Sequence, residues 1–154
     1  MIAKEELDKL ALKYETSDFI KDDPVQFVHR FKTKEDMELA GFISSLFAYG
    51  NRKLFIKKLE DVFSRADFDI ANYVKNGDFS NLTGVEYRFS KDYDIIPVFK
   101  ILNNLYKESK GLEELFSFSF DGLADNGRGD NYDRFLKKVV DYFYARAPQD
   151  AGHG

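Results

Sequence analysis

Apolar residues recur at steps of three and four along most of this chain, which is the spacing of one face of an α-helix. The segment 5–14 is the first example, with an apolar face of Leu7, Leu10, Ala11 and Tyr14. No segment alternates convincingly between apolar and polar residues, as a half-buried strand would. A length of 154 residues suits one compact core better than two. We predict an all-α fold without significant sheet. The fold that we expect is a single orthogonal bundle of about five to seven helices over residues 1–150, followed by a flexible tail over residues 151–154.

Capping residues indicate where helices begin and end. Thr33 stands three residues before Asp36, the spacing of a capping box, and a helical run follows it as far as Gly50. Asn51 can cap the next helix. A later helix is expected to begin at Asp94, which would leave Pro97 in the first turn, where proline is tolerated.

The helix after Thr33 carries two unlike faces. One face is bulky and holds Leu39, Phe42, Ile43 and Leu46. The other is a stripe of small residues, Gly41, Ser44, Ser45 and Ala48. Because small side chains allow a close approach and cores are densely packed, we expect this stripe to lie beneath a neighbouring helix.

The composition of the chain excludes several kinds of chemistry and indicates where in the cell the protein is expected. The chain has no cysteine, which removes disulfides, thiolate nucleophiles and Cys-based metal sites. It begins with charged residues and has no run long enough to cross a membrane, so a cytoplasmic protein without a membrane partner is expected. A net charge of −4 disfavours wholesale wrapping of a phosphate backbone but leaves room for a local basic patch.

The most informative local pattern is Tyr49-Gly50-Asn51-Arg52-Lys53. It places two cations in the first turn of a helix, where the macrodipole already makes positive charge unfavourable. An anion held by the free N–H groups, Arg52 and Lys53 would relieve that repulsion. The alternative is an exposed charged turn without a ligand.

Two further segments set an arginine beside aromatic rings, His29-Arg30-Phe31 and Tyr87-Arg88-Phe89. Such neighbours suit base stacking or phosphate contact, but they are also typical of core rings flanked by an extended side chain. We include His29, Arg30 and Arg88 with Tyr49, Asn51, Arg52 and Lys53 as candidate residues for binding nucleic acid or an anion. No catalytic residue, metal site or cofactor is predicted, and the acidic segment 121–133 lacks the spacing of a calcium loop.

The segments 23–24 (Asp-Pro), 29–31 (His-Arg-Phe), 38–43 (Glu-Leu-Ala-Gly-Phe-Ile) and 48–53 together resemble the bacterial family called domain of unknown function 2400. Members of that family usually continue into a C-terminal section with a Lys-Arg-Leu-Asn and an Asp-Thr-His-Val stretch, and neither occurs here. That section is similar to the helix-hairpin-helix DNA glycosylase superfamily, whose catalytic Asp has no counterpart in this chain. The resemblance implies a nucleic-acid-binding helical module and assigns no catalytic residue.

Two functions from different classes therefore stay open. The first is a module that contacts DNA or RNA through the Tyr49–Lys53 loop. The second is a structural or protein-interaction domain without catalytic activity, in which the many aromatic residues serve packing and self-association into homo-oligomers. A small-molecule enzyme that uses His29 as its acid or base ranks third, because no partner for the imidazole is identifiable.

Overall fold

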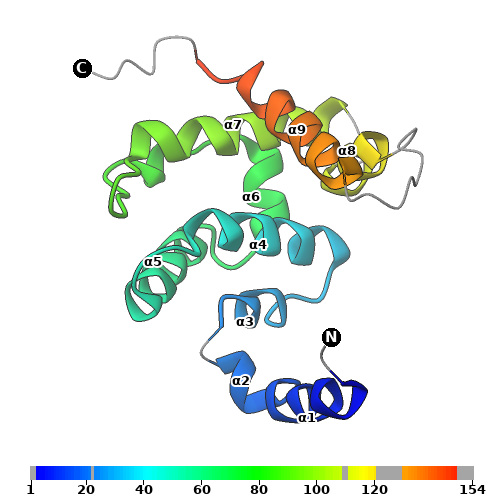
Figure 1. Ribbon diagram of the computed structural model, residues 1–154. Coiled ribbons are helices and arrows are strands. Elements are labelled where there is room, and N and C mark those ends of the chain that lie inside the picture. Colours follow the sequence, from blue (N-terminus) through cyan, green and yellow to red (C-terminus); the bar gives the residue numbers. More distant parts are fainter. Residues whose placement is uncertain (1–2, 22, 109–110, 121–129, 149–154) are drawn as a thin grey trace. The chain divides into compact units, whose positions relative to one another are not determined.

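The computed structural model describes residues 3–21, 23–108, 111–120 and 130–148, and these residues are helical with short connections (Figure 1). The helices are α1 (Lys4–Tyr14), α2 (Ser17–Lys21), α3 (Val25–Val28), α4 (Lys34–Phe47), α5 (Arg52–Arg65), α6 (Ile70–Asn76), η1 (Ser80–Leu82), α7 (Asp92–Glu108), α8 (Leu112–Phe120) and α9 (Asp130–Tyr144). Within the described ranges, β pairing is limited to one isolated bridge between Tyr87 and Ser90. The all-α prediction is confirmed.

The described residues hold nine α-helices, more than the five to seven expected. The difference comes from short helices such as α2 and α3, which are too brief to show a clear apolar period. Backbone contacts group the chain into two compact units, 1–61 and 62–154, each of which is treated by itself below. A single domain over 1–150 stays a prediction, and the tail 151–154 lies outside the described residues. No helix in the described part has the length and apolar character that a membrane span requires.

In the first unit, capping residues mark the helix starts, and α3 packs on α4. The Oγ1 atom of Thr33 accepts a hydrogen bond from the Asp36 backbone N–H (3.1 Å) and its hydroxyl donates to the Asp36 carboxylate (2.5 Å), so the predicted helix start is confirmed. Asp23 acts similarly before α3, since its Oδ1 accepts from the Val25 N–H at 2.9 Å. Phe27 on α3 is fully buried.

The small-residue stripe of α4 is only half covered. A Cβ on Gly41 would lie 3.5 Å from the Val28 side chain of α3, and Ser44 is 3% exposed. Ser45 and Ala48 are exposed instead, so the prediction was wrong for them. The physical reason for Ala48 is that α4 ends at Phe47, which places Ala48 in the cap and off the helical face. Ser45 satisfies its hydroxyl locally by donating to the Phe42 carbonyl at 2.6 Å.

Replacing Ser44 by leucine should lower the free energy of unfolding by about 1–3 kcal/mol, because the larger side chain would overpack a filled site. The Ser44 Oγ has no hydrogen-bond partner within the described residues, so the variant loses no hydrogen bond that would confuse the result. Urea unfolding measures the change. Ser45→Leu is the matched control at an exposed position, and equal stability of the two variants would contradict tight packing at Ser44.

The second unit is organised around aromatic rings. Phe99 of α7 is 1% exposed and its ring lies 6.0 Å from that of Tyr73 on α6 and 5.6 Å from that of Phe79. Tyr73 and Phe79 meet edge to face at 5.4 Å, a favourable geometry for two rings. This aromatic cluster holds α6 and η1 against α7.

A buried amide joins the end of α6 to α7. Asn103 donates from Nδ2 to the carbonyls of Val74 (2.7 Å) and Lys75 (3.0 Å), which lie in the last turn of α6. Gly77 follows in the left-handed region (φ 76°), where a Cβ would come within 3.1 Å of the Asn103 amide. The end of α6 therefore packs closely on the Asn103 amide, and a side chain at position 77 would crowd that amide.

The start of α7 differs from the prediction by two residues. The helix begins at Asp92, and the Asp94 carboxylate accepts the Lys91 N–H at 2.9 Å, as in a capping box. Pro97 consequently lies in the second turn of α7 and not in the first. Because proline has no backbone N–H, the Tyr93 carbonyl lacks the hydrogen bond that residue 97 would otherwise donate.

Candidate nucleic-acid interface

The loop between α4 and α5 brings Tyr49, Asn51, Arg52 and Lys53 together at one helix start. Gly50 holds a φ of 81°, which is readily available to glycine and uncommon for other residues. Asn51 then caps α5 through its Oδ1, which accepts from the Leu54 N–H at 3.3 Å, and its carbonyl accepts from Leu54 and Phe55 at 3.1 Å. The predicted cap is confirmed.

Arg52 and Lys53 are exposed at the first two positions of α5. Within the described residues, neither side chain has a hydrogen bond or ion pair, and neither backbone N–H has an acceptor. No acidic residue occupies this first turn, whereas α1, α4, α7 and α8 each carry two. Positive charge at this helix start is therefore not neutralised by the protein's own carboxylates in that turn.

The positive surface continues along α5 to Lys57, which is not among the binding residues predicted from the sequence. Lys57 stands one turn after Lys53, and both side chains are exposed. Lys58, by contrast, lies 3.3 Å from the Asp61 carboxylate. The four-residue spacing of Lys53 and Lys57 was the available signal, and it extends the candidate interface along one helical row.

His29 and Arg30 lie at the end of α3, and Arg30 is already engaged. Its Nη1 is 2.6 Å from the Glu60 carboxylate, its Nη2 donates to Gln26 at 2.8 Å, and its guanidinium sits 4.6 Å from the centre of the Phe27 ring. Glu60 is eight residues along α5 from Arg52, which is about 12 Å along the helix axis. Arg30 thus ties α3 to α5 away from the helix start, while His29 is exposed.

Arg88 belongs to the second unit and occupies the tip of a tight turn. Tyr87 and Ser90 close this turn with two backbone hydrogen bonds of 2.8 and 3.0 Å. Arg88 adopts a φ of 54°, which is uncommon for a residue with a side chain, and its guanidinium lies 5.5 Å from the Phe89 ring centre. Phe89 is 83% exposed.

Comparison with known protein families gives a match that covers most of the chain. A model described as Protein of unknown function (DUF2400) matches residues 23–153. The chain belongs to the DUF2400 family. A search of curated proteins and a search of solved structures each gave no match, so they add no support to the likeness to the DNA glycosylases.

In this DUF2400 chain, a polar hollow of about 390 Å³ lies between the end of α5, α6 and η1. Tyr73 donates to the Asn81 side chain at 2.5 Å, and Asn81 donates to the Arg65 carbonyl at 2.7 Å. Burial, and secondly the Asp78 carboxylate, raises the pKa of the Tyr73 phenol to about 12. The described acidic and histidine side chains form no group of three arranged to hold a metal.

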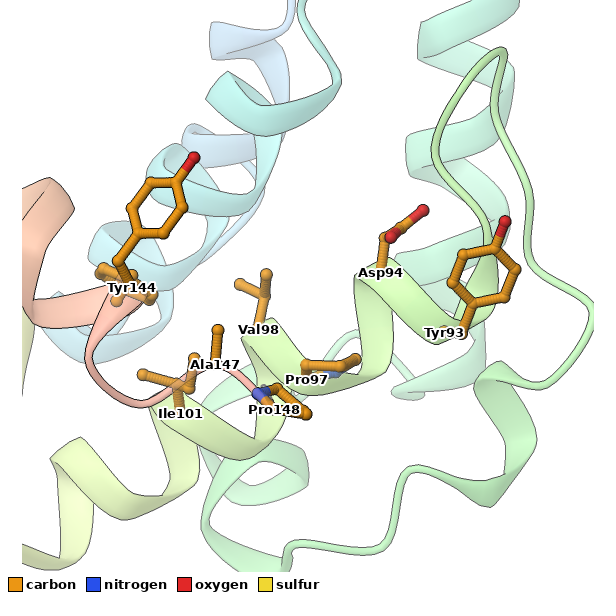
Figure 2. A pocket seen from close by; sticks show the side chains of 9 residues that line it. Tyr93, Asp94, Pro97, Val98, Ile101, Tyr144, Ala147 and Pro148 are labelled. Carbon is orange, nitrogen blue, oxygen red and sulfur yellow. The ribbon is translucent and has the colours of Figure 1, made fainter. Parts of the chain in front are cut away.

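A second hollow of the DUF2400 chain is mostly apolar and measures about 350 Å³ (Figure 2). One wall comes from α7, with Tyr93, Asp94, Pro97 and Val98. The other comes from Tyr144, the last residue of α9, and from Ala147 and Pro148 just after it. None of the seven residues predicted to bind a ligand lines either hollow. The candidate interface is thus a basic helix start that lies outside both hollows.

Proposed function

We propose that this protein binds nucleic acid through the start of α5, with Arg52 and Lys53 contacting phosphate groups. The observation that carries the proposal is the pair of exposed, unneutralised cations beside two unused backbone N–H groups. Each of these groups attracts negative charge, and together they suit a phosphate oxygen.

The neighbouring residues would take different roles in this interface. Lys57 would extend the phosphate contacts by one helical turn, and Tyr49 would offer a stacking surface for a base. Asn51 would be less available, because its side-chain oxygen already caps the helix. Arg30 would contribute little, since a phosphate would have to displace Glu60 from it.

The direct test is the affinity for a fluorescent single-stranded DNA of about 20 nucleotides, measured by anisotropy at low salt. Arg52→Ala with Lys53→Ala should weaken binding at least tenfold, because each change removes a charge-assisted hydrogen bond worth roughly 1.5–3 kcal/mol. Lys4→Ala with Lys9→Ala is the matched control, since it removes the same charge from exposed positions on α1. Equal affinities for the two double variants would rule out the α5 start as the binding surface.

The same samples separate this proposal from the alternative of a protein-interaction domain. A nucleic-acid-binding module should gain mass when DNA is added, in proportion to the DNA bound. If the mass of the protein and the anisotropy of the DNA do not change when the two are mixed, even at low salt, the interaction domain is supported instead.

A further inference from the structure

Helix α1 exposes its apolar side chains to solvent. None of its 11 residues is buried within the described part of the chain. Leu7 is 51% exposed, and Leu10 and Tyr14 are each 44% exposed. A helix of this length is only marginally stable in water by itself, because most helices in proteins are stabilised by packing of an apolar face. The apolar side of α1 therefore lacks the contact that would stabilise the helix.

The apolar residues of α1 form a narrow stripe. Its members follow one another at steps of four, three and four residues, which is the spacing of a coiled-coil seam: Ala3, Leu7, Leu10 and Tyr14. The Ala3 carbonyl accepts a hydrogen bond from the Leu7 N–H at 3.2 Å, so the first member belongs to the first turn. Leu12, which is 80% exposed, lies about 170° around the helix from the centre of the stripe. The stripe is a surface that suits one partner helix.

The charges of α1 indicate which partner fits the stripe. Three lysines and three carboxylates lie within Lys4–Tyr14, so the helix has no net charge that would attract a phosphate backbone or an anionic membrane. Glu6 and Lys13 stand on the same edge of the stripe, and within the described residues neither has an ion pair. The Lys13 Nζ lies 5.0 Å from the centre of the Tyr14 ring. A partner helix that carries both signs along one edge, in the reverse order, would pair with both residues.

We propose that the α1 stripe binds the α1 stripe of a second copy of the chain, antiparallel, about a two-fold axis midway between Leu7 and Leu10. In this register Leu7 of one copy meets Leu10 of the other, and Tyr14 meets Ala3. Each ring then faces a small side chain, which is the arrangement that lets facing helices interdigitate. A patch that is complementary to itself under a two-fold rotation is the requirement for a symmetric dimer.

This register brings opposite charges closest together. Glu6 of one copy is offset by about two residues, or 3 Å along the helix axis, from Lys13 of the other, and the two-fold axis forms this ion pair twice. Like charges on that edge are further apart, about 7.5 Å along the axis for the two Glu6 residues and about 13.5 Å for the two Lys13 residues. On the other edge Lys4 meets Ala11, and the two Lys4 residues are about 13.5 Å apart along the axis. Charge complementarity therefore favours this pairing.

The other charged residues of α1 do not oppose the antiparallel pair. Asp8 and Lys9 lie about 130° around the helix from the centre of the stripe and Glu5 about 170°, so all three stay in water. A parallel pair fits less well. It would set Tyr14 against Tyr14, and Glu6 would face the uncharged Ala11 of the other copy.

The size of the surface sets the strength of the dimer. A helix of 11 residues is about 16 Å long and buries less than the roughly 800 Å² per partner of a standard stable interface. Self-association is therefore weak and depends on concentration. This inference is independent of nucleic-acid binding, because its surface belongs to α1 and not to α5.

Sedimentation equilibrium of the full chain provides the first test, at concentrations up to about 1 mM, the range of a weak complex. The mass of the unaltered protein should rise toward that of a dimer. Leu10→Glu should raise the dissociation constant at least tenfold, because the dimer would bury an unpaired charge against Leu7 of the other copy. Leu12→Glu makes the same change on the far side of α1 and should associate as the unaltered protein does. A protein that stays monomeric throughout, or equal dissociation constants for the two glutamate variants, would overturn the proposal.

A charge exchange at low salt tests the antiparallel register. Glu6→Lys and Lys13→Glu each turn both ion pairs of the dimer into like-charged pairs, so each variant alone should dimerise about threefold more weakly or worse. In an equimolar mixture, one copy of each variant forms a dimer in which both pairs are again of opposite charge. The mixture should therefore associate more tightly than either variant alone. A mixture that associates no better than its components would contradict the proposed pair, since a parallel pair has no Glu6–Lys13 contact to restore.

Discussion

Replacing Phe99 by alanine should lower the free energy of unfolding by about 3–5 kcal/mol, the cost of emptying a fully buried aromatic site. Phe99 is 1% exposed and contacts the rings of Tyr73 and Phe79, so its loss weakens α6, η1 and α7 together. Since small domains are stable by only about 5–15 kcal/mol, the variant should be near its unfolding transition at room temperature. Urea titration followed by far-ultraviolet dichroism measures the change.

Phe89→Ala supplies the matched control for this prediction. It removes the same side chain from a position that is 83% exposed, so the free energy of unfolding should change by less than about 0.5 kcal/mol. If the two phenylalanine variants were equally stable, the aromatic cluster around Phe99 would not be the core of this unit.

Asn103→Leu should cost about 2–3 kcal/mol of unfolding free energy, although leucine is similar in volume and more apolar. The reason is that the carbonyls of Val74 and Lys75 would each lose the hydrogen bond that this amide donates, and leucine offers no donor in its place. Thermal melts of the pure variant give the difference.

Asn104→Leu is the control for this second prediction, because Asn104 is the next residue on α7 and is exposed. Its melting temperature should stay close to that of the unaltered protein. A stabilising effect of Asn103→Leu would show that burial of an apolar side chain outweighs the two hydrogen bonds, which would contradict the role given to this amide.

Structural features that depend on residues close together in the sequence could be predicted. The capping box at Thr33 and the cap at Asn51 depend on side chains three residues from the groups that they bond, so their spacing is visible in the sequence. The exposed pair Arg52 and Lys53 follows from the same local reasoning. The start of α7 was misplaced because Pro97 was assumed to need the first turn, while the Asp94 cap acts backward on Lys91.

Features that depend on distant partners could not be read in this way. Asn103 bonds carbonyls 28 and 29 residues away, and Arg30 bonds a carboxylate 30 residues away. No periodicity or spacing reports such pairs. The candidate site was therefore predicted in its local part, the helix start, whereas the engagement of Arg30 required knowledge of how α3 meets α5.

The salt dependence of binding is the sharpest test of the claim that cations at the start of α5 contact phosphates. The logarithm of the affinity for single-stranded DNA should fall linearly with the logarithm of salt concentration, because bound cations release counterions. Arg52→Ala with Lys53→Ala should reduce the slope by about 0.7 for each phosphate contact removed. Parallel lines for the variant and the unaltered protein would contradict the claim, since they would mean that neither cation touches the nucleic acid.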